Sequence, residues 1–600
     1  MLRTALADNP GSSAIPTELA VQPASRPEFG DLQIAGCLQL GKPLGKKPRD
    51  LAQLVAAQLT GHPALAKVEI AGAGYVNLHL ADSYIEGQLA ALATDPHHGV
   101  RQRFSGERVV VDYSSPNVAK PMHIAHIRST IIGDALARVM RAVGYSVVSD
   151  NHLGDWGTQF GKLIVAYRRW LDPVAYAATP IAELVRLYQK FVNEEKREAE
   201  ALGIKKPERK AEGAAPADAD ADEEDAEAAA LAPDATPLLK EARAELVKLQ
   251  SGDPENLKLW REFVSASMRE FERTYARLDV KFDVMLGESF YNPRLTSIVE
   301  ELLEKGIAER SRGAVICTVE GEPAPLLIRK ADGSFLYGTT DLATIEHRVK
   351  EWNPSRILYV VGAPQMLHFR QVFAVARKMG FGCSLEHLPF GSMRFRDEEG
   401  NWTTGSTRKG NVPLLDEFID EAIRRARTVA QGKNAELDAG ELDEVARVVG
   451  IGAVKYNDLA RDRQSDINFD LDKALALEGN TAPYIQYAYA RMRSIQRRAK
   501  EDGATVAQVP KLTLPAERAL GRRLLDYGAA VERVAETTRP HSLCEYLFEL
   551  AGAVSTLYNE VPVLKAPPEE RAARLLLLER AASTLRHGLS LLGIEVPERM

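Results

Sequence analysis

The sequence predicts an α/β fold centred on a parallel sheet, with an α+β domain before it and an all-α bundle after it. Residues 108–151 give the first indication, because a β-rich run, a polar loop, an amphipathic run and a second β-rich run follow one another. Residues 356–373 repeat the order of buried strand and helix. From residue 471 the apolar spacing is helical to the end. Strand–helix–strand units of this kind are typical of a Rossmann-type sheet.

The chain has 600 residues, too many for one hydrophobic core, so we expect three domains. Residues 1–105 form the predicted α+β domain, with helices over residues 31–40 and from Pro48. Residues 106–470 form the parallel-sheet domain and residues 471–600 the bundle. The sheet domain contains a helical insertion. Within it, residues 196–236 are acidic and lack aromatics and periodicity, which predicts a disordered or loosely helical surface segment.

Composition excludes several classes of protein. Hydrophobic residues make up 45% and charged residues 26%, which is ordinary for a globular protein. Since no apolar run is long enough to span a bilayer and the first ten residues lack a signal-peptide core, we expect a cytoplasmic protein without a membrane partner. Four widely spaced cysteines indicate free thiols. Residues 196–236 carry −6 of the net charge of −7, so the charge does not argue against a nucleic-acid partner.

A candidate anion site lies where the first strand of residues 108–151 gives way to the helix. The loop there contains Lys120, His123 and His126, and Pro116 and Pro121 lie in the same loop. Helix N-termini bind anions through free backbone N–H groups and the helix dipole. Two imidazoles and an ammonium group at this position predict a phosphate site.

The string PMHIAH, residues 121–126, resembles the His-x-Gly-His signature of class I aminoacyl-tRNA synthetases. The longer string SPNVAKPMHIAHIRST, residues 115–130, resembles the form found in the arginyl-tRNA synthetase family. The resemblance implies that His123 and His126 contact the ATP phosphates and stabilise the transition state of adenylate formation. Ala125 replaces the family's glycine, so one methyl is added where the adenine approaches the backbone.

A second signature of the family, KMSTRKG, has its counterpart in TGSTRKG, residues 404–410. Thr404 replaces the leading lysine, whereas Ser406, Arg408 and Lys409 remain. In family members that depart here, the lysine just upstream of the first signature is thought to substitute, and Lys120 occupies that place. A mobile ammonium group can reach developing phosphate charge from either side. The resemblance therefore assigns catalytic roles to Lys120, Ser406, Arg408 and Lys409, besides the two histidines.

The resemblance also implies a pocket for L-arginine. Its Tyr-x-x-x-Asp pair, Tyr337 and Asp341, would hold the guanidinium, which favours a carboxylate on its N–H donors and an aromatic ring on its face. The residues implied in arginine binding are Ser115, Asn117, His123, Glu288, Tyr337, Asp341 and Gln365. His368 would join His123, Ala125 and His126 at the ATP site. From the residues alone, Asp341 also suits an N-cap and His368 a surface or capping position.

Other segments match the family without carrying a specific role. The string GDWGTQFG, residues 154–161, is one, and Trp156 within it most often indicates a core aromatic. The N-terminal domain has the family's GDL and GYVN elements, which implies contact with the tRNA elbow. The bundle has aromatic and basic residues with two possible roles. They either contact unpaired bases, or the tyrosines pack in the core and the arginines lie on a solvent-exposed face. These residues are Tyr484, Tyr487, Tyr489, Arg491 and Arg493.

The leading hypothesis is a class I arginine–tRNA ligase, because the matching segments cover most of the chain in the family's order. Its expected partners are arginine tRNA, L-arginine, ATP as substrate and Mg²⁺ bridging the phosphates, with no metal held by the protein alone. We expect a monomer that needs bound tRNA for activation. Ala125 and Thr404 motivate an alternative, a tRNA-binding paralogue with weakened catalysis. A cysteinyl-type ligase or a nucleotidylyltransferase is disfavoured, because a Cys/His zinc site is missing and because a nucleotidylyltransferase would not need the bundle.

Overall fold

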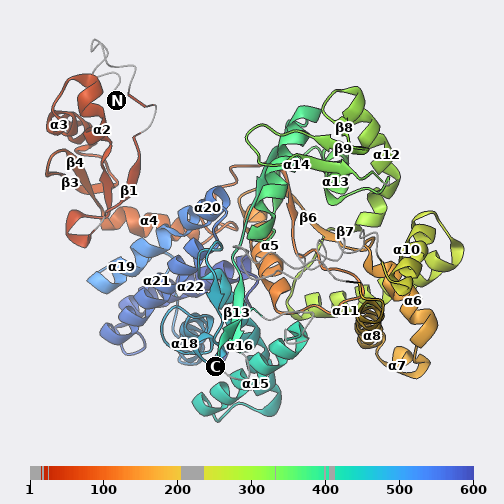
Figure 1. The fold of residues 1–600 in the computed structure, drawn as a ribbon. Helices are drawn as coiled ribbons and strands as arrows, with labels where there is room; N and C mark the ends of the chain where they lie inside the picture. The colour runs from red at the N-terminus through yellow and green to blue at the C-terminus, as the bar shows by residue number, and fades with distance from the viewer. Residues whose placement is uncertain are drawn as a thin grey trace.

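The computed structural model describes residues 15–16, 19–24, 26–204, 235–331, 333–396, 400–404 and 413–600. A five-stranded sheet with helices on both faces forms its centre. A small α+β unit lies to one side, and a helical bundle lies between that unit and the sheet (Figure 1). The predicted fold class is therefore confirmed.

The N-terminal unit is an antiparallel sheet in the order β1-β2-β4-β3 with helices packed against it. Its elements are β1 (Val21–Pro23), η2 (Pro27–Phe29), β2 (Leu32–Ile34), α2 (Gly36–Leu44), α3 (Pro48–Leu59), β3 (Leu65–Ala71), β4 (Tyr75–Leu80) and α4 (Asp82–Leu92). The helix predicted over residues 31–40 is wrong in its first half. Residues 32–34 pair with residues 76–78 of β4, and this long-range pairing overrides the local helical spacing.

The central sheet is parallel throughout, in the order β12-β11-β5-β6-β7. Its strands are β5 (Arg108–Asp112), β6 (Ser146–Leu153), β7 (Val284–Gly287), β11 (Arg356–Tyr359) and β12 (Ser384–His387). The chain adds strands outwards from β5 to β7 and then returns to place β11 on the other side of β5. Open α/β sheets bind ligands at the carboxyl ends of the strands beside such a reversal. The ends of β5 and β11 therefore mark the expected site.

Helices cover both faces of this sheet. Helix α5 (Ala125–Ala142) links β5 to β6, so the unit predicted over residues 108–151 is confirmed. A Cβ on Gly133 of α5 would stand 2.2 Å from Tyr113, which shows how closely the helix approaches the chain just after β5. Val109 and Val111 pack in the core beneath α5, whereas Val110 packs in a second core on the opposite face. The helices of that opposite face are α12 (Glu288–Glu304), α13 (Tyr337–Trp352) and α14 (Met366–Met379).

Two insertions extend the sheet domain. Between β6 and β7 lie α6 (Gln159–Trp170), α7 (Pro173–Ala178), α8 (Pro180–Ala201), α10 (Pro237–Gln250) and α11 (Pro254–Arg277). Between α12 and α13 lies an antiparallel sheet of β8 (Glu309–Ser311), β9 (Ala314–Cys317) and β10 (Leu326–Arg329). The acidic segment predicted over residues 196–236 begins inside α8, and residues 205–234 lie outside the described residues.

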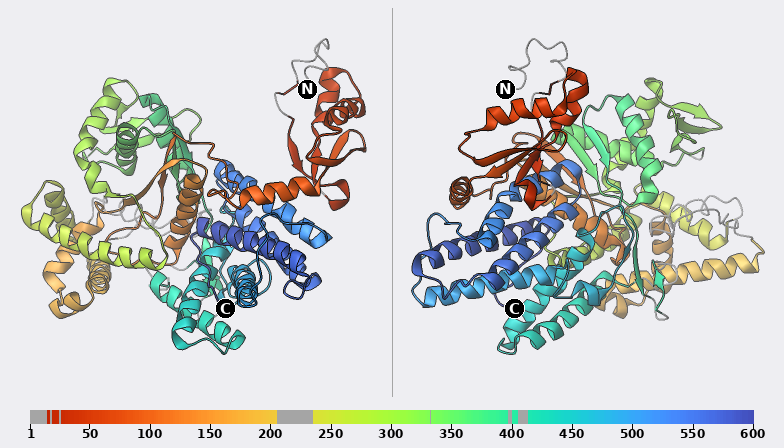
Figure 2. Two further views of the ribbon diagram at one scale, coloured as in Figure 1. Left: turned by 180° about the vertical axis from the view of Figure 1, so that it is seen from behind. Right: turned by 90° about the vertical axis from the view of Figure 1, so that its left-hand side faces the viewer.

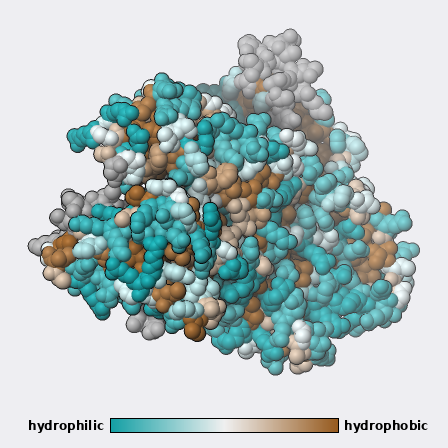
Figure 3. Space-filling view, turned by 90° about the vertical axis from the view of Figure 1, so that its right-hand side faces the viewer, coloured by the Kyte–Doolittle hydropathy of each residue, from teal (hydrophilic) through white to brown (hydrophobic). Residues whose placement is uncertain are grey.

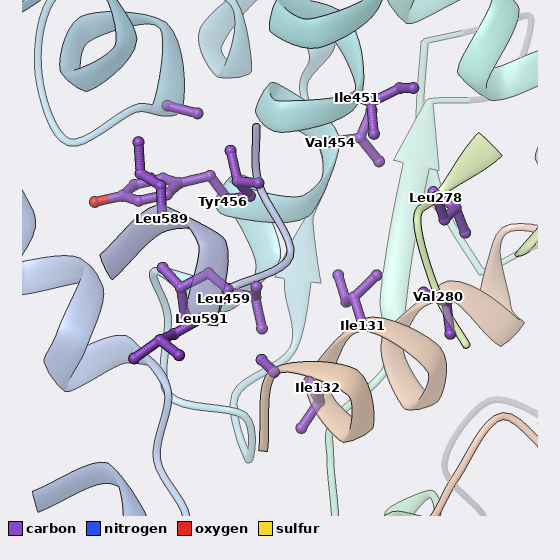
Figure 4. Packing of buried hydrophobic residues seen from close by; sticks show 14 of the residues in the cluster. Ile131, Ile132, Leu278, Val280, Ile451, Val454, Tyr456, Leu459, Leu589 and Leu591 are labelled. Atoms are coloured by element: carbon purple, nitrogen blue, oxygen red, sulfur yellow. The ribbon is translucent and has the colours of Figure 1, made fainter. Parts of the chain in front are cut away.

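The remainder of the chain is mostly helical. Its elements are η3 (Ala363–Gln365), β13 (Met393–Arg396), β14 (Trp402–Thr403), α15 (Leu415–Lys433), α16 (Ala439–Leu459), β15 (Ile467–Asn468), α17 (Leu471–Ala474), α18 (Ala482–Glu501), α19 (Pro515–Leu525), α20 (Tyr527–Thr537), α21 (His541–Glu560) and α22 (Pro568–Leu591). The helical pattern predicted from residue 471 is confirmed. Figure 4 shows side chains of α5, α16 and α22 in one core, including Ile131, Tyr456 and Leu589. The bundle therefore packs directly against the helix that starts at the candidate anion site.

The N-terminal unit is attached to the bundle through α4 and α19 (Figure 2). Arg518 of α19 donates to both carboxylate oxygens of Asp31, at 2.9 and 2.7 Å, and to Asp82 at 2.8 Å. Asp31 also accepts a hydrogen bond from the backbone N–H of Leu80 at 2.7 Å. The aspartate of the GDL element thus joins the N-terminal sheet to the bundle.

We expect acid to weaken this junction through His587, whose ring stacks on His98 at a centroid distance of 4.3 Å. Burial lowers the pKa of His587 to about 4, and burial also lowers the pKa of His98. Between about pH 6.5 and 4 the unfolded chain binds more protons, so the free energy of unfolding is highest above pH 6.5 and falls towards pH 4. Melting curves at pH 7 and pH 5 should show a smaller acid loss for His587→Gln than for the wild type, by on the order of 1 kcal/mol. Equal losses would contradict the assignment.

The cysteines and the molecular surface bear on two predictions made from the sequence, free thiols and no membrane-spanning run. Cys37, Cys317 and Cys544 are buried and Cys383 is partly buried, all as free thiols. No helix in the described part of the chain is both long and apolar enough to cross a membrane. The face in Figure 3 is mostly hydrophilic with small apolar patches.

Candidate active site at the carboxyl ends of the strands

His123 and His126 lie together at the start of α5. Their ring centroids are 3.9 Å apart, and the backbone N–H of His123 donates to Nδ1 of His126 at 3.1 Å. A neutral His126 therefore carries its proton on Nε2, from which it can donate to an anion. Within the described residues, Nδ1 of His123 is buried without a hydrogen-bond partner. The structure thus brings the two histidines of the first signature together with free hydrogen-bonding capacity.

Both histidines are held neutral. Burial lowers the pKa of His123 to about 4, with a further contribution from the nearby charge of Lys120. Burial also lowers the pKa of His126 well below its usual value, with smaller contributions from His123 and Lys120. Neutral imidazoles at a helix start act as hydrogen-bond donors without adding a second repulsive charge beside Lys120.

The loop that carries these groups is fixed by backbone pairing to the end of β6. The N–H of Val118 donates to Gly154 at 3.0 Å, and the N–H of Gly154 donates to Pro116 at 3.3 Å. A Cβ on Gly154 would stand 1.9 Å from Oδ1 of Asn117, so a larger residue there would displace the Asn117 side chain. The glycine of the GDWG string therefore lets Asn117 pack against the end of β6.

Ser115 lies in the same loop, and its polar groups face inward. Its φ is +47°, a left-handed conformation that is uncommon for serine. Its N–H donates to Asn151 at 3.0 Å and its hydroxyl to Asp112 at 3.2 Å. Ser115 therefore supports the loop, and its direct contact with arginine stays a prediction.

Lys120 is partly buried beside α8. Its Nζ lies 6.0 Å from the ring centroid of Tyr188, and Nζ of Lys162 lies 5.7 Å from the same centroid. Lys120 is close enough to both signature histidines to depress their pKa values, and Lys162 does not contribute to either shift. The charge of Lys120 therefore acts on the histidine pair, and its catalytic role stays a prediction.

The second signature is only partly described. Ser406, Arg408 and Lys409 lie outside the described residues, and their roles stay predictions. The chain that follows them pairs with the histidine loop, because the N–H of Ile124 donates to Pro413 at 3.1 Å and that of Leu415 donates to Met122 at 3.0 Å. No local pattern indicates this pairing, because its partners lie almost 300 residues apart.

The start of α15 is also held by α11. Arg273 and Arg277 of α11 bind the two carboxylate oxygens of Asp416 at 2.7 and 2.9 Å. This contact fixes the chain two residues after Leu414, which itself forms a β-bridge with His123.

The predicted arginine-binding residues gather at the same edge of the sheet. Tyr337 begins α13, Glu288 begins α12 and Gln365 ends η3 just before α14. Asp341 is not an N-cap, because α13 begins four residues earlier with Leu336 as its cap. The Asp341 carboxylate instead lies 2.5 Å from Nε2 of His368 at the start of α14. This contact joins a residue predicted for arginine binding to one predicted for ATP binding.

Asp155 was given no role by the sequence and lies inside this cluster. It is buried, and its carboxylate accepts from the N–H and the hydroxyl of Ser289 at 2.8 and 2.7 Å. A Cβ on Gly287 would stand 2.2 Å from the same carboxylate. Asp155 therefore fixes the start of α12 on both sides of Glu288. Trp156 is half-buried against the core and packs edge-on against Trp260, and its indole N–H has no hydrogen-bond partner among the described residues.

The parallel sheet and the histidine pair at the helix start after β5 point to the class I aminoacyl-tRNA synthetases. The family model described as tRNA synthetases class I (R), catalytic domain, matches residues 89–471. The models of the arginyl tRNA synthetase N terminal domain and the DALR anticodon binding domain match residues 1–80 and 485–600. The chain therefore belongs to the arginyl-tRNA synthetase family, and the predicted family is confirmed.

Individual relatives agree with these matches along the whole chain. The arginine–tRNA ligase of Fusobacterium nucleatum is 39% identical over 98% of this chain and 96% of its own. That of Frankia casuarinae is 41% identical with the same coverage. The Thermus thermophilus arginyl-tRNA synthetase structure matches 100% of this chain and 98% of its own with a TM-score of 0.80 at 24% identity, which supports the fold.

Proposed function

We propose that the chain activates L-arginine with ATP and transfers the arginyl group from the adenylate to the 3′ end of arginine tRNA. The observation that carries the proposal is the His123–His126 pair, with ring centroids 3.9 Å apart, at the start of the helix that follows β5, on the central parallel sheet. Full-length similarity to arginine–tRNA ligases supports it further. Neither feature favours the alternative of a catalytically weakened paralogue.

In the proposed first step the arginine carboxylate attacks the α-phosphorus of ATP in line and pyrophosphate leaves. ATP enters as its Mg²⁺ complex, since Mg²⁺ binds phosphate oxygens and retains its waters. The protein supplies orientation and stabilises charge. His126 donates from Nε2 and Lys120 supplies a positive charge. Both lie at the start of α5, where the helix dipole also favours a bound anion.

Arginine is recognised at the other end of the cluster. Asp341 accepts hydrogen bonds from the guanidinium, and the ring of Tyr337 lies against its face. Glu288, Gln365, Asn117 and Ser115 complete the pocket, with Asn117 and His123 at the α-amino or carboxylate end. His368 contacts both the Asp341 carboxylate and the nucleotide, so arginine and ATP binding are coupled through the 2.5 Å contact.

In the second step a hydroxyl of the terminal tRNA ribose attacks the carbonyl of the adenylate, and AMP leaves. Two parts of the chain hold the tRNA body. The N-terminal unit presents the exposed cations Lys42, Lys46, Lys47 and Arg49 to the elbow, and the bundle binds the anticodon. We expect the enzyme to work in the cytoplasm as a monomer. Light scattering after gel filtration tests the oligomeric state.

The decisive experiment is arginine-dependent exchange of pyrophosphate into ATP, measured with and without arginine tRNA. We expect exchange above background with tRNA and little without it. No exchange despite intact tRNA binding would favour the paralogue. Charging with cysteine in a panel of amino acids would overturn the assignment.

The bundle separates the tyrosines that the sequence left undecided. Tyr489 is a core residue whose hydroxyl donates to Glu598 at 2.8 Å, and Arg493 binds the same carboxylate at 3.0 Å. Tyr487 is 37% exposed, and Arg491 lies 3.4 Å from the ring centroid of exposed Tyr558. Tyr487 and the Arg491–Tyr558 pair are therefore better placed to stack on anticodon bases.

Replacing Arg491 with Ala should therefore weaken tRNA binding by about 10-fold, because one cation–π and stacking contact is lost. The KM for arginine and that for ATP should change little. Filter binding or the KM for tRNA measures the effect. Arg424→Ala, in an exposed pair with Glu421 on α15, is the matched control. Equal effects of the two substitutions would place the anticodon elsewhere.

A further inference from the structure

A buried guanidinium, that of Arg348 on α13, joins the three strands at the centre of the sheet. Asp112 at the end of β5 is in register with Asp150 of β6 and with Tyr359 of β11. Residues in register on parallel strands point to the same face, so two carboxylates and a phenol converge on the side covered by α13. Arg348 donates to Asp112 at 2.6 Å and to Asp150 at 2.9 Å, and its guanidinium carbon lies 5.2 Å from the ring centroid of Tyr359.

The burial of these charged groups is unfavourable for the stability of the fold. Arg348 and Asp150 are fully buried, and Asp112 is nearly so. Two carboxylates face one guanidinium, which leaves a surplus negative charge. Three of the cluster's buried polar atoms have no hydrogen-bond partner within the described residues: Nη1 of Arg348, Oδ1 of Asp150 and the hydroxyl of Tyr359. Apolar residues of similar volume usually stabilise a core as well as a buried ion pair does. A role in function explains the cluster better than a role in packing.

The cluster lies next to the residues proposed to bind arginine. Arg348 follows Asp341 by seven residues on α13, which places it on the same helix face two turns away, about 10.5 Å along the axis. The other oxygen of Asp112 accepts from the hydroxyl of Ser115, in the loop that carries Asn117. One forked contact therefore sets the position of α13, and of Asp341 on it, relative to β5, β6 and the loop after β5.

We propose that Arg348 is a positioning residue for arginine recognition. By bridging Asp112 and Asp150 it fixes the distance between Asp341 and the loop that holds the other end of the amino acid. It balances one of the two buried carboxylates and leaves the surplus negative charge that favours a cationic side chain in the pocket. The proposal deepens the function proposed above and rests on it.

The test compares KM for arginine with KM for ATP in tRNA-dependent exchange. Arg348→Met should raise the KM for arginine by about 10-fold or more, with less than a twofold change for ATP. Arg348→Lys should lie between Met and wild type, because a lysine keeps the charge but cannot fork onto two carboxylates. Asp150→Asn, which leaves the contact with Asp112 in place, should raise the KM for arginine by a smaller factor. Lys350→Met, an exposed cation on the same helix, is the control.

A melting curve is recorded for each variant, so that KM values are compared only among folded proteins. Unchanged KM for arginine in folded Arg348→Met and Asp150→Asn would overturn the proposal, as would equal increases for arginine and ATP. If Arg348→Met does not fold, the other two variants test the proposal. A KM for arginine that rises from wild type to Asp150→Asn to Arg348→Lys would support the proposal, and the absence of that order would overturn it. Wild-type protein that fails to activate arginine with tRNA would instead contradict the proposed function.

Discussion

Replacing Lys120 with Ala is expected to slow arginine-dependent pyrophosphate exchange by about 10²- to 10³-fold, the usual effect of losing one preorganised charge at a developing anion. The substituted second signature, with Thr404 in place of lysine, leaves Lys120 as the described cation that acts on both signature histidines. The loss should appear in kcat with little change in KM for arginine, because the charge is needed mainly as pyrophosphate leaves. Single-turnover formation of the adenylate is the measurement.

Lys162→Ala is the matched control for Lys120→Ala. Both ammonium groups lie about equally far from the ring centroid of Tyr188, at 5.7 and 6.0 Å, but only Lys120 influences the histidine pair among the described residues. Removing Lys120 should also raise the pKa of His123, which NMR titration detects, since the lysine charge helps to lower it. An unchanged exchange rate would mean that Arg408 or Lys409 supplies the charge.

Local sequence patterns predict the parts of the fold that short-range physics decides. The strand, loop and helix of residues 108–142 are present because apolar residues recur with the correct period and Gly144 ends the helix. Residues 31–40 show the limit of this argument. Their helical spacing is real, but β2 forms there because β4, more than forty residues later, offers a partner strand.

The residues of the candidate site fall into the same two groups, those that local patterns predict and those that only long-range contacts bring together. His123, His126 and Lys120 are adjacent in sequence, so their meeting at the start of α5 follows from one helix prediction. Arg348 is different, because a single arginine in a helical pattern normally indicates a solvated position. Its partners Asp112 and Asp150 precede it by 236 and 198 residues, so the sheet order alone reveals the cluster. The Asp155–Ser289 contact, which orients the start of α12, is hidden for the same reason.

The second large effect is expected for Asp341→Ala, which should raise the KM for arginine on the order of 10²-fold and that for ATP only slightly. A charge-assisted hydrogen bond to a guanidinium contributes about 1.5–3 kcal/mol, and each 1.4 kcal/mol is a factor of ten in affinity. Asp341 is the part-buried carboxylate at the start of α13 beside Tyr337, so the side chain can reach a ligand without unfolding the helix. Steady-state exchange at varied arginine and at varied ATP measures the two constants.

The contact between Asp341 and His368 suggests a competing explanation, in which Asp341 is a structural residue that orients the nucleotide site. That explanation expects Asp341→Ala to raise both Michaelis constants equally. Glu346→Ala distinguishes general damage to α13, because this buried carboxylate binds Arg294 and Lys350 and lies outside the proposed pocket. It should lower the melting temperature and leave the KM for arginine near the wild-type value. A selective increase for arginine in Asp341→Ala, absent from Glu346→Ala, would therefore locate guanidinium recognition at the first turn of α13, held in register by Arg348 two turns further along.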